Sequence, residues 1–368
     1  MRKLTGILIC MATILLVNSS FGELTKVAEN PSHFIGIEKF SKFKKKLAGN
    51  EVILTSPEIK APMAWDELVV SWNAHAPSGT YLKIEARGLY SNRATKFYTL
   101  GLWSEDTARF PRESVRQPKD SDGKVSTDTL MLSELCEKTQ IRVTLGSAEK
   151  GVEPKLKFLG LSFLNSKAQT SPLPPNQKAW GKIIETPERS QNSYPEEQGW
   201  CSPTSLSMIL IRWSEILHRP EMNLDVPECA VGVWDKNYGT GNWPFNTAFA
   251  GKFPGMRAYI SRFTDISELE DWIAAGIPVI ISAPFHLLAP GRKDTGSGHV
   301  VTVIGFTETG DVVINDPATN LEKGQKVRHI YKRENVLNAW NKSHNTVYLI
   351  YPESAKIPKN RLGHWEQK

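Results

Sequence analysis

The stretch EEQGWCSPTSLSMILIRW (196–213) places a cysteine directly in front of an apolar run of helical length. Apolar side chains then recur at spacings of three and four residues, which predicts a helix over 201–217. They are Leu206, Ile209, Leu210, Trp213 and Leu217. Pro203 suits the first turn of a helix, where its missing N–H is no loss. Cys201 is therefore expected at the helix N-terminus, as packing, as half of a disulfide or as a nucleophile.

The start of a helix suits a reactive sulfur. Its dipole and its unpaired N–H groups stabilise a thiolate, and they also stabilise the negative charge that develops on a carbonyl oxygen under attack. A nucleophilic cysteine needs in addition a base that holds the proton. Because cysteines at helix starts are also common in packed cores, the helix alone does not decide the role of Cys201.

Two downstream segments can supply that base and its partner. GSGHVVTVIGF opens a β-branched strand at His299, and DVVINDP ends a strand at Asp316. TETG (307–310) between them predicts a hairpin, in which the imidazole and the carboxylate meet. Alone, His299 is typical of a strand-edge histidine and Asp316 of an Asx-turn. The combination with Cys201 predicts a catalytic triad, and His286 is the nearest rival base.

The rest of residues 179–352 predicts an α+β domain, because helices come first and short apolar strands follow. ISELEDWIAAG (266–276) fits a helix in which Ser267 and Glu270 have capping-box spacing. GTGNWPFNTAF (239–249) is interpreted as an aromatic loop. It either forms a wall of the substrate cleft or packs the two lobes together, and both possibilities stay open.

Residues 51–165 have the pattern of an antiparallel β-sandwich, with several short strands between turn signals. The expected strands are 68–74, 81–90, 96–104, 141–147 and 155–163. In the second of them Leu82, Ile84 and Ala86 alternate with charged residues, as in a half-buried sheet. Trp65, Trp72 and Trp103 either pack in the core, as is more common, or stack on a sugar.

The remaining segments connect or flank these two domains. Residues 166–178 are polar and proline-rich, which indicates a linker. Residues 23–50 form a lead-in segment, whose FSKFKKKLAGN stretch is predicted as a solvated helix, and 353–368 a polar tail. Residues 1–22 read as a cleaved signal peptide. We therefore expect a secreted or periplasmic protein without stable membrane insertion after cleavage.

Composition excludes several other classes. Loss of Arg2 and Lys3 with the leader lowers the formal net charge from +6 to +4, which is too mild to indicate nucleic-acid binding. Cleavage leaves Cys136, Cys201 and Cys229, an odd number, so at least one thiol is free or pairs between molecules. The cysteines and histidines have no metal-ligand spacing. We expect no metal and no cofactor.

The sequence also resembles a known family. WCSPTSLSMIL, GNWPFNTAFA, GSGHVVTVIGF and INDPA resemble, in this order, the motifs of the bacteriocin-processing cysteine peptidases, family 39 of the cysteine class, and their secreted "like" branch. The resemblance covers about residues 180–352 and implies a papain-like fold. It implies Cys201 as nucleophile, His299 as base and acid, and Asp316 as orienting residue. SWNA…PSGTYLKIEARG resembles a β-rich domain that accompanies such peptidases in exported bacterial proteins.

The family also implies a glutamine whose side-chain amide helps to bind the oxyanion. Gln191, in PERSQNSYP, matches the glutamine of the secreted branch, whereas Gln198 lies only three residues before Cys201. Gln191 is preferred, and a solvated loop amide is the ordinary alternative for either. Leader-cutting members are commonly fused to a transporter, and this sequence has neither a spanning helix nor a phosphate-binding loop.

These observations predict a secreted bacterial cysteine peptidase that acts on a peptide or protein through a thioester intermediate. The same triad would serve an amidase or acyltransferase acting on cell-wall or other amides. A third possibility is an inert binding protein that uses its β-domain. The sequence does not indicate the substrate or the oligomeric state.

Overall fold

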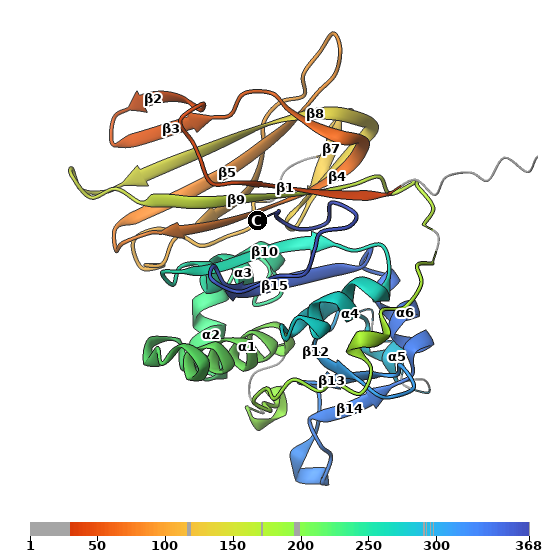
Figure 1. Ribbon diagram of the computed structural model, residues 1–368. Helices are drawn as coiled ribbons and strands as arrows, with labels where there is room; N and C mark the ends of the chain where they lie inside the picture. The colour runs from red at the N-terminus through yellow and green to blue at the C-terminus, as the bar shows by residue number, and fades with distance from the viewer. Residues whose placement is uncertain are drawn as a thin grey trace, which may run out of the picture.

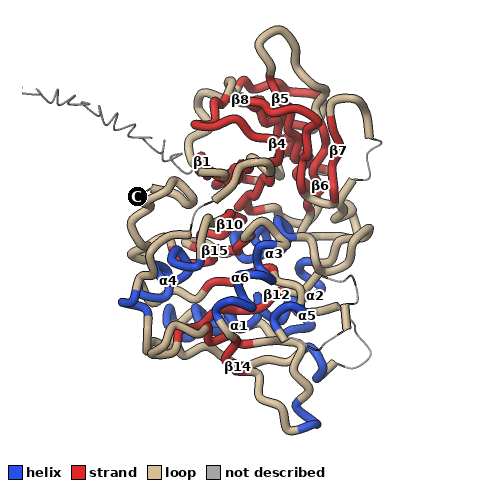
Figure 2. The backbone as a smooth tube through the Cα atoms, turned by 90° about the vertical axis from the view of Figure 1, so that its right-hand side faces the viewer, coloured by secondary structure: helices blue, strands red, loops and turns tan. Residues whose placement is uncertain are grey.

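Two antiparallel sheets organise the chain, one from each half of the sequence (Figure 1). The computed structural model describes residues 30–115, 119–170, 172–194, 199–289, 291, 293–294, 296 and 298–367. The expected signal peptide (1–22) lies outside the described residues. The strands of the first half lie above, and the helices gather below around the second sheet (Figure 2). The mixed α+β class expected from the sequence is confirmed.

The first half forms a nine-stranded sheet with the order β1-β9-β4-β8-β3-β2. In addition, β5 and β7 pair with β8, and β6 pairs with β5. Its strands are β1 Ser32–Ile37, β2 Lys44–Ala48, β3 Glu51–Thr55, β4 Ile59–His75, β5 Thr80–Leu89, β6 Tyr98–Trp103, β7 Gly123–Ser126, β8 Thr129–Ser147 and β9 Lys155–Leu164. All five strands expected in this half are present. Leu82, Ile84 and Ala86 are fully buried, as their alternation predicts.

The expected sandwich of two separate sheets is not confirmed, because all nine strands belong to one hydrogen-bonded sheet. The long strands β4 and β8 explain the difference: β8 pairs with β4 over its first part and with β3 and β5 over its last part. The sheet nevertheless curls over itself. Trp72 on β4 meets Trp103 on β6 with ring centroids 6.2 Å apart, although two strands separate β4 from β6. Trp65 is also fully buried, so these indoles are core residues.

The lysine-rich lead-in was wrongly predicted as a helix. Lys44, Lys45 and Lys46 lie on β2, which pairs with β3 in a hairpin at the edge of the sheet. Their side chains are exposed. Charged residues on an edge strand discourage pairing with another chain, which gives this lysine run a structural reason.

The second half forms a six-stranded antiparallel sheet with the order β10-β15-β11-β12-β13-β14. Its strands are β10 Met256–Arg262, β11 Val279–Ser282, β12 Val300–Phe306, β13 Val312–Asn315, β14 Arg328–Tyr331 and β15 Thr346–Pro352. Its helices are α1 Cys201–Leu217, α2 Val226–Val233, α3 Trp243–Gly251, α4 Ile266–Ala274, α5 Phe285–Leu288 and α6 Arg333–Asn341. Short 3-10 turns lie at Gln177–Ala179, Gln191–Ser193, Pro220–Met222 and Leu321–Lys323. The expected helix over 201–217 is confirmed.

Helix α4 is present, but its capping differs from the expectation. Asp265, not Ser267, is the N-cap, and its side chain accepts a hydrogen bond from the Ser267 backbone N–H. The helix therefore begins before the serine, so the spacing of Ser267 and Glu270 has no capping role. Glu270 is instead fully buried and accepts hydrogen bonds from the Trp180 indole and from the Asn176 backbone N–H. Glu270 therefore anchors residues 176–180, through which the chain enters this domain.

The two halves are joined by aromatic packing and by hydrogen bonds. Phe245 of α3 packs against both Trp72 and Trp103 of the first sheet, with ring centroids 5.9 and 5.5 Å apart. The Asn73 amide donates to the Ala258 carbonyl at 2.6 Å, which links β4 to β10. The expected aromatic loop was wrong from Trp243 onward, since these residues form α3. Phe245 packs the two halves together, as one of its two interpretations required.

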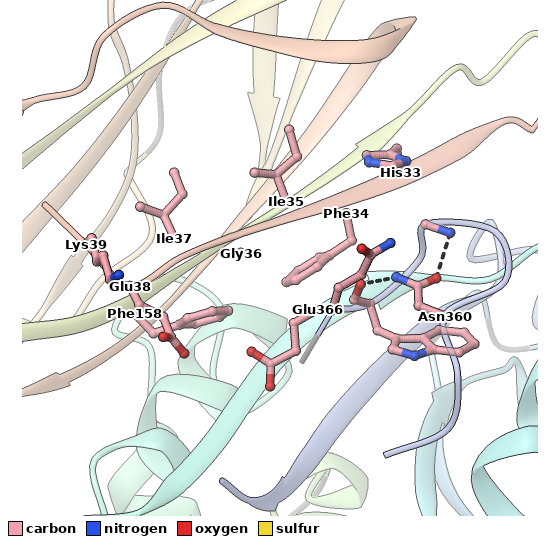
Figure 3. Close-up of a pocket in the computed structure, with 13 residues that line it drawn as sticks. His33, Phe34, Ile35, Gly36, Ile37, Glu38, Lys39, Phe158, Asn360 and Glu366 are labelled. Atoms are coloured by element: carbon pink, nitrogen blue, oxygen red, sulfur yellow. Dashed lines mark hydrogen bonds between the residues drawn. The ribbon is translucent and has the colours of Figure 1, made fainter. Parts of the chain in front are cut away.

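The segment after β15 returns between the two halves and ends beside β1 (Figure 1). Trp365 and His364 are buried there, and the His364 carbonyl accepts a hydrogen bond from Ser261. The Phe34 N–H of β1 donates to the Gly363 carbonyl of this segment at 2.7 Å, and a cavity of about 700 Å³ beside them is lined by Phe34, Phe158 and Glu366 (Figure 3). The polar tail expected from the sequence is thus packed against both domains.

Candidate active site

Cys201 is the first residue of α1. Trp200 occupies the N-cap, and its side chain makes no capping hydrogen bond. The first N–H groups of a helix have no partner within it, so they stay available to an anion. The Cys201 side chain is partly exposed, whereas the next residues of the helix are buried. The Cys201 side chain is therefore accessible at the N-terminus of α1, as the sequence predicts.

His299 directly precedes β12 and is 5% exposed. Its ring packs against Phe285 of α5, with ring centroids 5.3 Å apart. The imidazole Nε2 lies 2.8 Å from Asp316 Oδ1. Because the carboxylate holds Nε2, the ring nitrogen Nδ1 is the one left for a thiol. A hydrogen bond with the Cys201 side chain is among the interactions of this ring.

Asp316 follows β13, and the hairpin expected around TETG brings it to His299. β12 and β13 pair antiparallel, and Thr307 and Asp311 close the turn through a backbone hydrogen bond of 2.9 Å. Asp316 Oδ2 accepts a hydrogen bond of 2.6 Å from the Tyr331 hydroxyl. The Ala318 backbone N–H donates to Oδ1 at 2.9 Å. Each of these hydrogen bonds stabilises the ionised form of the Asp316 carboxylate.

The pKa values of His299 and Asp316 are shifted in opposite directions. Burial by itself would lower the pKa of His299, but the charge and hydrogen bond of Asp316, followed by Cys201, raise it to about 10. Burial would raise the pKa of Asp316, but the charge of His299 and its hydrogen bonds, including that of Tyr331, hold it below its usual value. The pair is thus an imidazolium and a carboxylate at neutral pH.

Gln191 is held close to this pair by the loop after Asp316. Its backbone N–H donates to the Pro317 carbonyl at 2.9 Å, and the Asn192 amide donates to the Ala318 carbonyl at 2.9 Å. The Gln191 Oε1 atom is buried and has no hydrogen-bond partner within the described part of the chain. Gln198, its rival from the sequence, lies outside the described residues.

The other reactive side chains lie elsewhere. Cys136 and Cys229 are free, like Cys201, but both are buried. Burial raises the pKa of each of these two thiols, which makes them poor nucleophiles. The rival base His286 lies 3.4 Å from Asp294 and not at Asp316. Only Cys201 combines exposure with an adjacent histidine among the described cysteines.

Two tyrosines near the site were not found from the sequence. Tyr331 reaches Asp316 from β14, a short strand without a clear hydrophobic pattern. Tyr348 of β15 lies 3.2 Å from the Ser202 hydroxyl, next to the cysteine. The place of β15 in the sheet depends on long-range pairing with β10 and β11, whereas β14 pairs with the preceding strand β13 and is short and weakly patterned.

The described residues contain no group of three or more histidine, cysteine, aspartate or glutamate side chains that could hold a metal ion. Within the same part of the chain, no helix is both long and apolar enough for a bilayer crossing.

Comparison with protein-family models gives two matches along the chain. Residues 49–163 match the Peptidase C39 N-terminal domain, and residues 183–348 match the Peptidase C39 like family. Searches of curated proteins and of solved structures found no significant match. The first match lies on the curled sheet, and the second runs from before Gln191 through α1 and the β12–β13 hairpin to β15. The chain therefore belongs to the C39-like cysteine peptidase family.

Proposed function

We propose that the protein is an active, papain-like cysteine peptidase that hydrolyses peptide bonds through a thioester acyl-enzyme. The observation that carries this proposal is the orientation of His299, which Asp316 holds at Nε2 while the ring interacts with Cys201. A buried imidazolium beside a thiol at a helix N-terminus favours the thiolate form of that sulfur. Membership of the family supports the same chemistry.

In the first half of the reaction, the Cys201 sulfur attacks the carbonyl carbon of the scissile bond. The electron pair of the carbonyl moves to its oxygen, which becomes an oxyanion. When the tetrahedral intermediate collapses, the C–N bond breaks and His299 gives its proton to the leaving amine. The product that remains is a thioester between Cys201 and the acyl part of the substrate.

In the second half, His299 is neutral and takes a proton from a water molecule. The resulting hydroxide attacks the thioester, the C–S bond breaks, and the thiolate and imidazolium form again. In both halves the N–H groups at the start of α1 are placed to bind the oxyanion. We assign the side-chain amide of Gln191 as the second donor, because its loop is bonded to the residues that follow Asp316.

The expected location is outside the cytoplasm. The support is the amino-terminal sequence, with basic Arg2 and Lys3, an apolar stretch and small residues before position 23. Cellular fractionation of the full-length protein, with mass determination of its mature N-terminus, checks this part of the proposal. Recovery of uncleaved protein in the cytoplasmic fraction would contradict it.

The activity is tested with Cys201→Ala. We expect the wild-type protein to hydrolyse members of a fluorogenic peptide library and the variant to hydrolyse none, while circular dichroism shows the same fold. Cys136→Ala is the matched control, because this buried thiol lies outside the proposed machinery, and it should keep the wild-type rate. Hydrolysis by Cys201→Ala at the wild-type rate would refute the assignment.

A further inference from the structure

A second cavity lies between the two halves of the molecule, close to the cysteine. Its volume is about 240 Å³, and the β7–β8 turn of the first sheet forms one of its walls. The opposite wall is the segment that leads into α3. The lining residues that matter here are Thr127, Asp128, Tyr238, Gly241 and Trp243. The N-terminal domain thus contributes directly to a cavity of the peptidase domain.

Contacts within the wall connect this cavity to Cys201. The Thr240 hydroxyl donates to the Gly199 carbonyl at 3.0 Å, just before the helix start. Burial raises the pKa of Tyr238, and the charges of Asp128 and Cys201 raise it further. The Tyr238 hydroxyl therefore lies within electrostatic reach of both groups.

Asp128 is a buried carboxylate without a cationic partner. It is 6% exposed, and its oxygens accept hydrogen bonds of 3.0 Å from the Trp243 backbone N–H and the Thr129 hydroxyl. Both donors are neutral, and no ion pair joins Asp128 to a cation in the part of the chain that the structure describes. Burial raises its pKa to about 6, against the effect of these hydrogen bonds and of the charge of Arg262. A buried charge is normally paired at contact distance, so the charge of Asp128 is compensated only in part here.

The cations around the cavity compensate the charge of Asp128 only in part: the charge of Arg262 lowers the pKa of Asp128 but does not offset the effect of burial. Arg262 is buried in an ion pair with Glu67, with a distance of 2.9 Å between nitrogen and oxygen. Lys342 and His344 are exposed at the rim. The half-buried Trp243 and the Tyr238 ring add apolar surface beside the carboxylate. The cavity therefore offers an anionic end and an aromatic wall.

We propose that this cavity is a substrate subsite for a cationic side chain, lysine or arginine, of a residue close to the scissile bond. Asp128 is the counter-ion for the ammonium or guanidinium group, and Tyr238 and Trp243 pack against the methylene stem. The inference rests on the proposed peptidase function. It gives the N-terminal domain a role in specificity, because its β7–β8 turn supplies the charge.

The test compares fluorogenic peptides that differ only in one residue before the scissile bond: lysine, arginine, norleucine or glutamate. Wild-type protein should prefer lysine or arginine over norleucine by about tenfold or more in kcat/KM at one position. Asp128→Asn keeps an oxygen for the Trp243 N–H but loses the charge, so its preference should fall to near unity. Glu322→Gln removes an exposed acidic charge far from the cavity and should leave the preference unchanged. An unchanged preference in Asp128→Asn would overturn the proposal.

A binding arm separates this inference from the peptidase function. Calorimetry with Cys201→Ala protein measures the affinity for the lysine and norleucine peptides without hydrolysis. If wild type cleaves no peptide, the peptidase proposal fails, and the affinity ratio still decides the subsite. Tighter binding of the lysine peptide that is lost in Cys201→Ala/Asp128→Asn supports it. Equal affinities of the two peptides contradict it.

Discussion

Two buried aspartates in the two halves of the molecule have opposite electrostatic settings. Asp316, after β13, is 1% exposed and faces the His299 imidazolium, and its pKa lies below the usual value. Asp128, in the turn directly before β8, is 6% exposed and accepts hydrogen bonds from neutral groups, and burial raises its pKa to about 6. Burial is nearly the same, so the partner decides the direction. A paired carboxylate serves to fix a neighbour, whereas an unpaired one is available for a ligand.

The largest expected difference between the two aspartates is in catalysis. Asp316→Asn removes the charge that orients His299 and keeps it protonated, so kcat should fall on the order of 10³-fold for every peptide. Asp128→Asn should keep kcat on a norleucine peptide within a few-fold of wild type. Steady-state kinetics of both variants on the same peptides measures this. Equal losses of kcat in the two variants would contradict the proposed difference between the roles of Asp316 and Asp128.

The next effect concerns stability and its pH dependence in Asp316→Asn. The pKa of His299 is raised from 6.5 to about 10 in the folded protein, so the ion pair stabilises the fold fully below pH 6.5. That contribution is lost as the pH rises toward 10. Urea unfolding at pH 6 should show the variant less stable than wild type by about 3 kcal/mol, with a smaller difference at pH 10. A difference that does not change with pH would contradict the ion pair.

Asp128→Asn should change stability in the other direction. A raised aspartate pKa means that the folded protein binds the proton more tightly than the unfolded chain, so wild type loses stability between pH 3.8 and about 6. Asparagine does not ionise, so the variant should be more stable than wild type by about 3 kcal/mol at pH 8. The gain should disappear near pH 4. Destabilisation at pH 8 would show that Asp128 has a counter-charge.

The smallest effect comes from Tyr331→Phe. The variant loses the 2.6 Å hydrogen bond to Asp316 Oδ2 and leaves that oxygen buried, at a cost of about 1–2 kcal/mol of unfolding free energy. Tyr194→Phe is the matched control, because its hydroxyl also donates to an aspartate, Asp225, but in an exposed position. Urea unfolding should show a smaller change for the control. Equal changes of the unfolding free energy in the two variants would contradict the buried position of the Tyr331–Asp316 hydrogen bond.

The parts of the site that were predictable depend on local sequence. The start of α1 follows from an apolar period and from Pro203, and the His299–Asp316 contact follows from a hairpin with a short turn. Five strands of the first half could be located from β-branched and aromatic runs. In each case residues that are close in sequence are also close in space, so the local sequence pattern was sufficient to predict the element.

The parts that were missed depend on long-range pairing. β4 and β8, which join the expected two sheets into one, have register shifts between Lys60 and Glu67. Pro62 lies in this segment and indicates an irregularity, but it does not indicate which strands pair. Asp128 stands in a polar STDT stretch that resembles a solvent-exposed turn, and only the packing of the two halves buries it. Tyr348 meets Ser202 from 146 residues away in the sequence, whereas Tyr331 lies only 15 residues after Asp316 but on a short strand, β14, without a clear hydrophobic pattern.

The rate of thiol alkylation at each cysteine tests most directly whether Cys201 and His299 act as a pair. Limiting iodoacetamide at pH 7, followed by peptide mass spectrometry, should label Cys201 alone in the wild-type protein, and much more slowly in His299→Ala. Cys136 and Cys229 should stay unlabelled until the protein is unfolded. Label on Cys136 or Cys229 in the folded protein, or an equal rate at Cys201 in His299→Ala, would contradict the account.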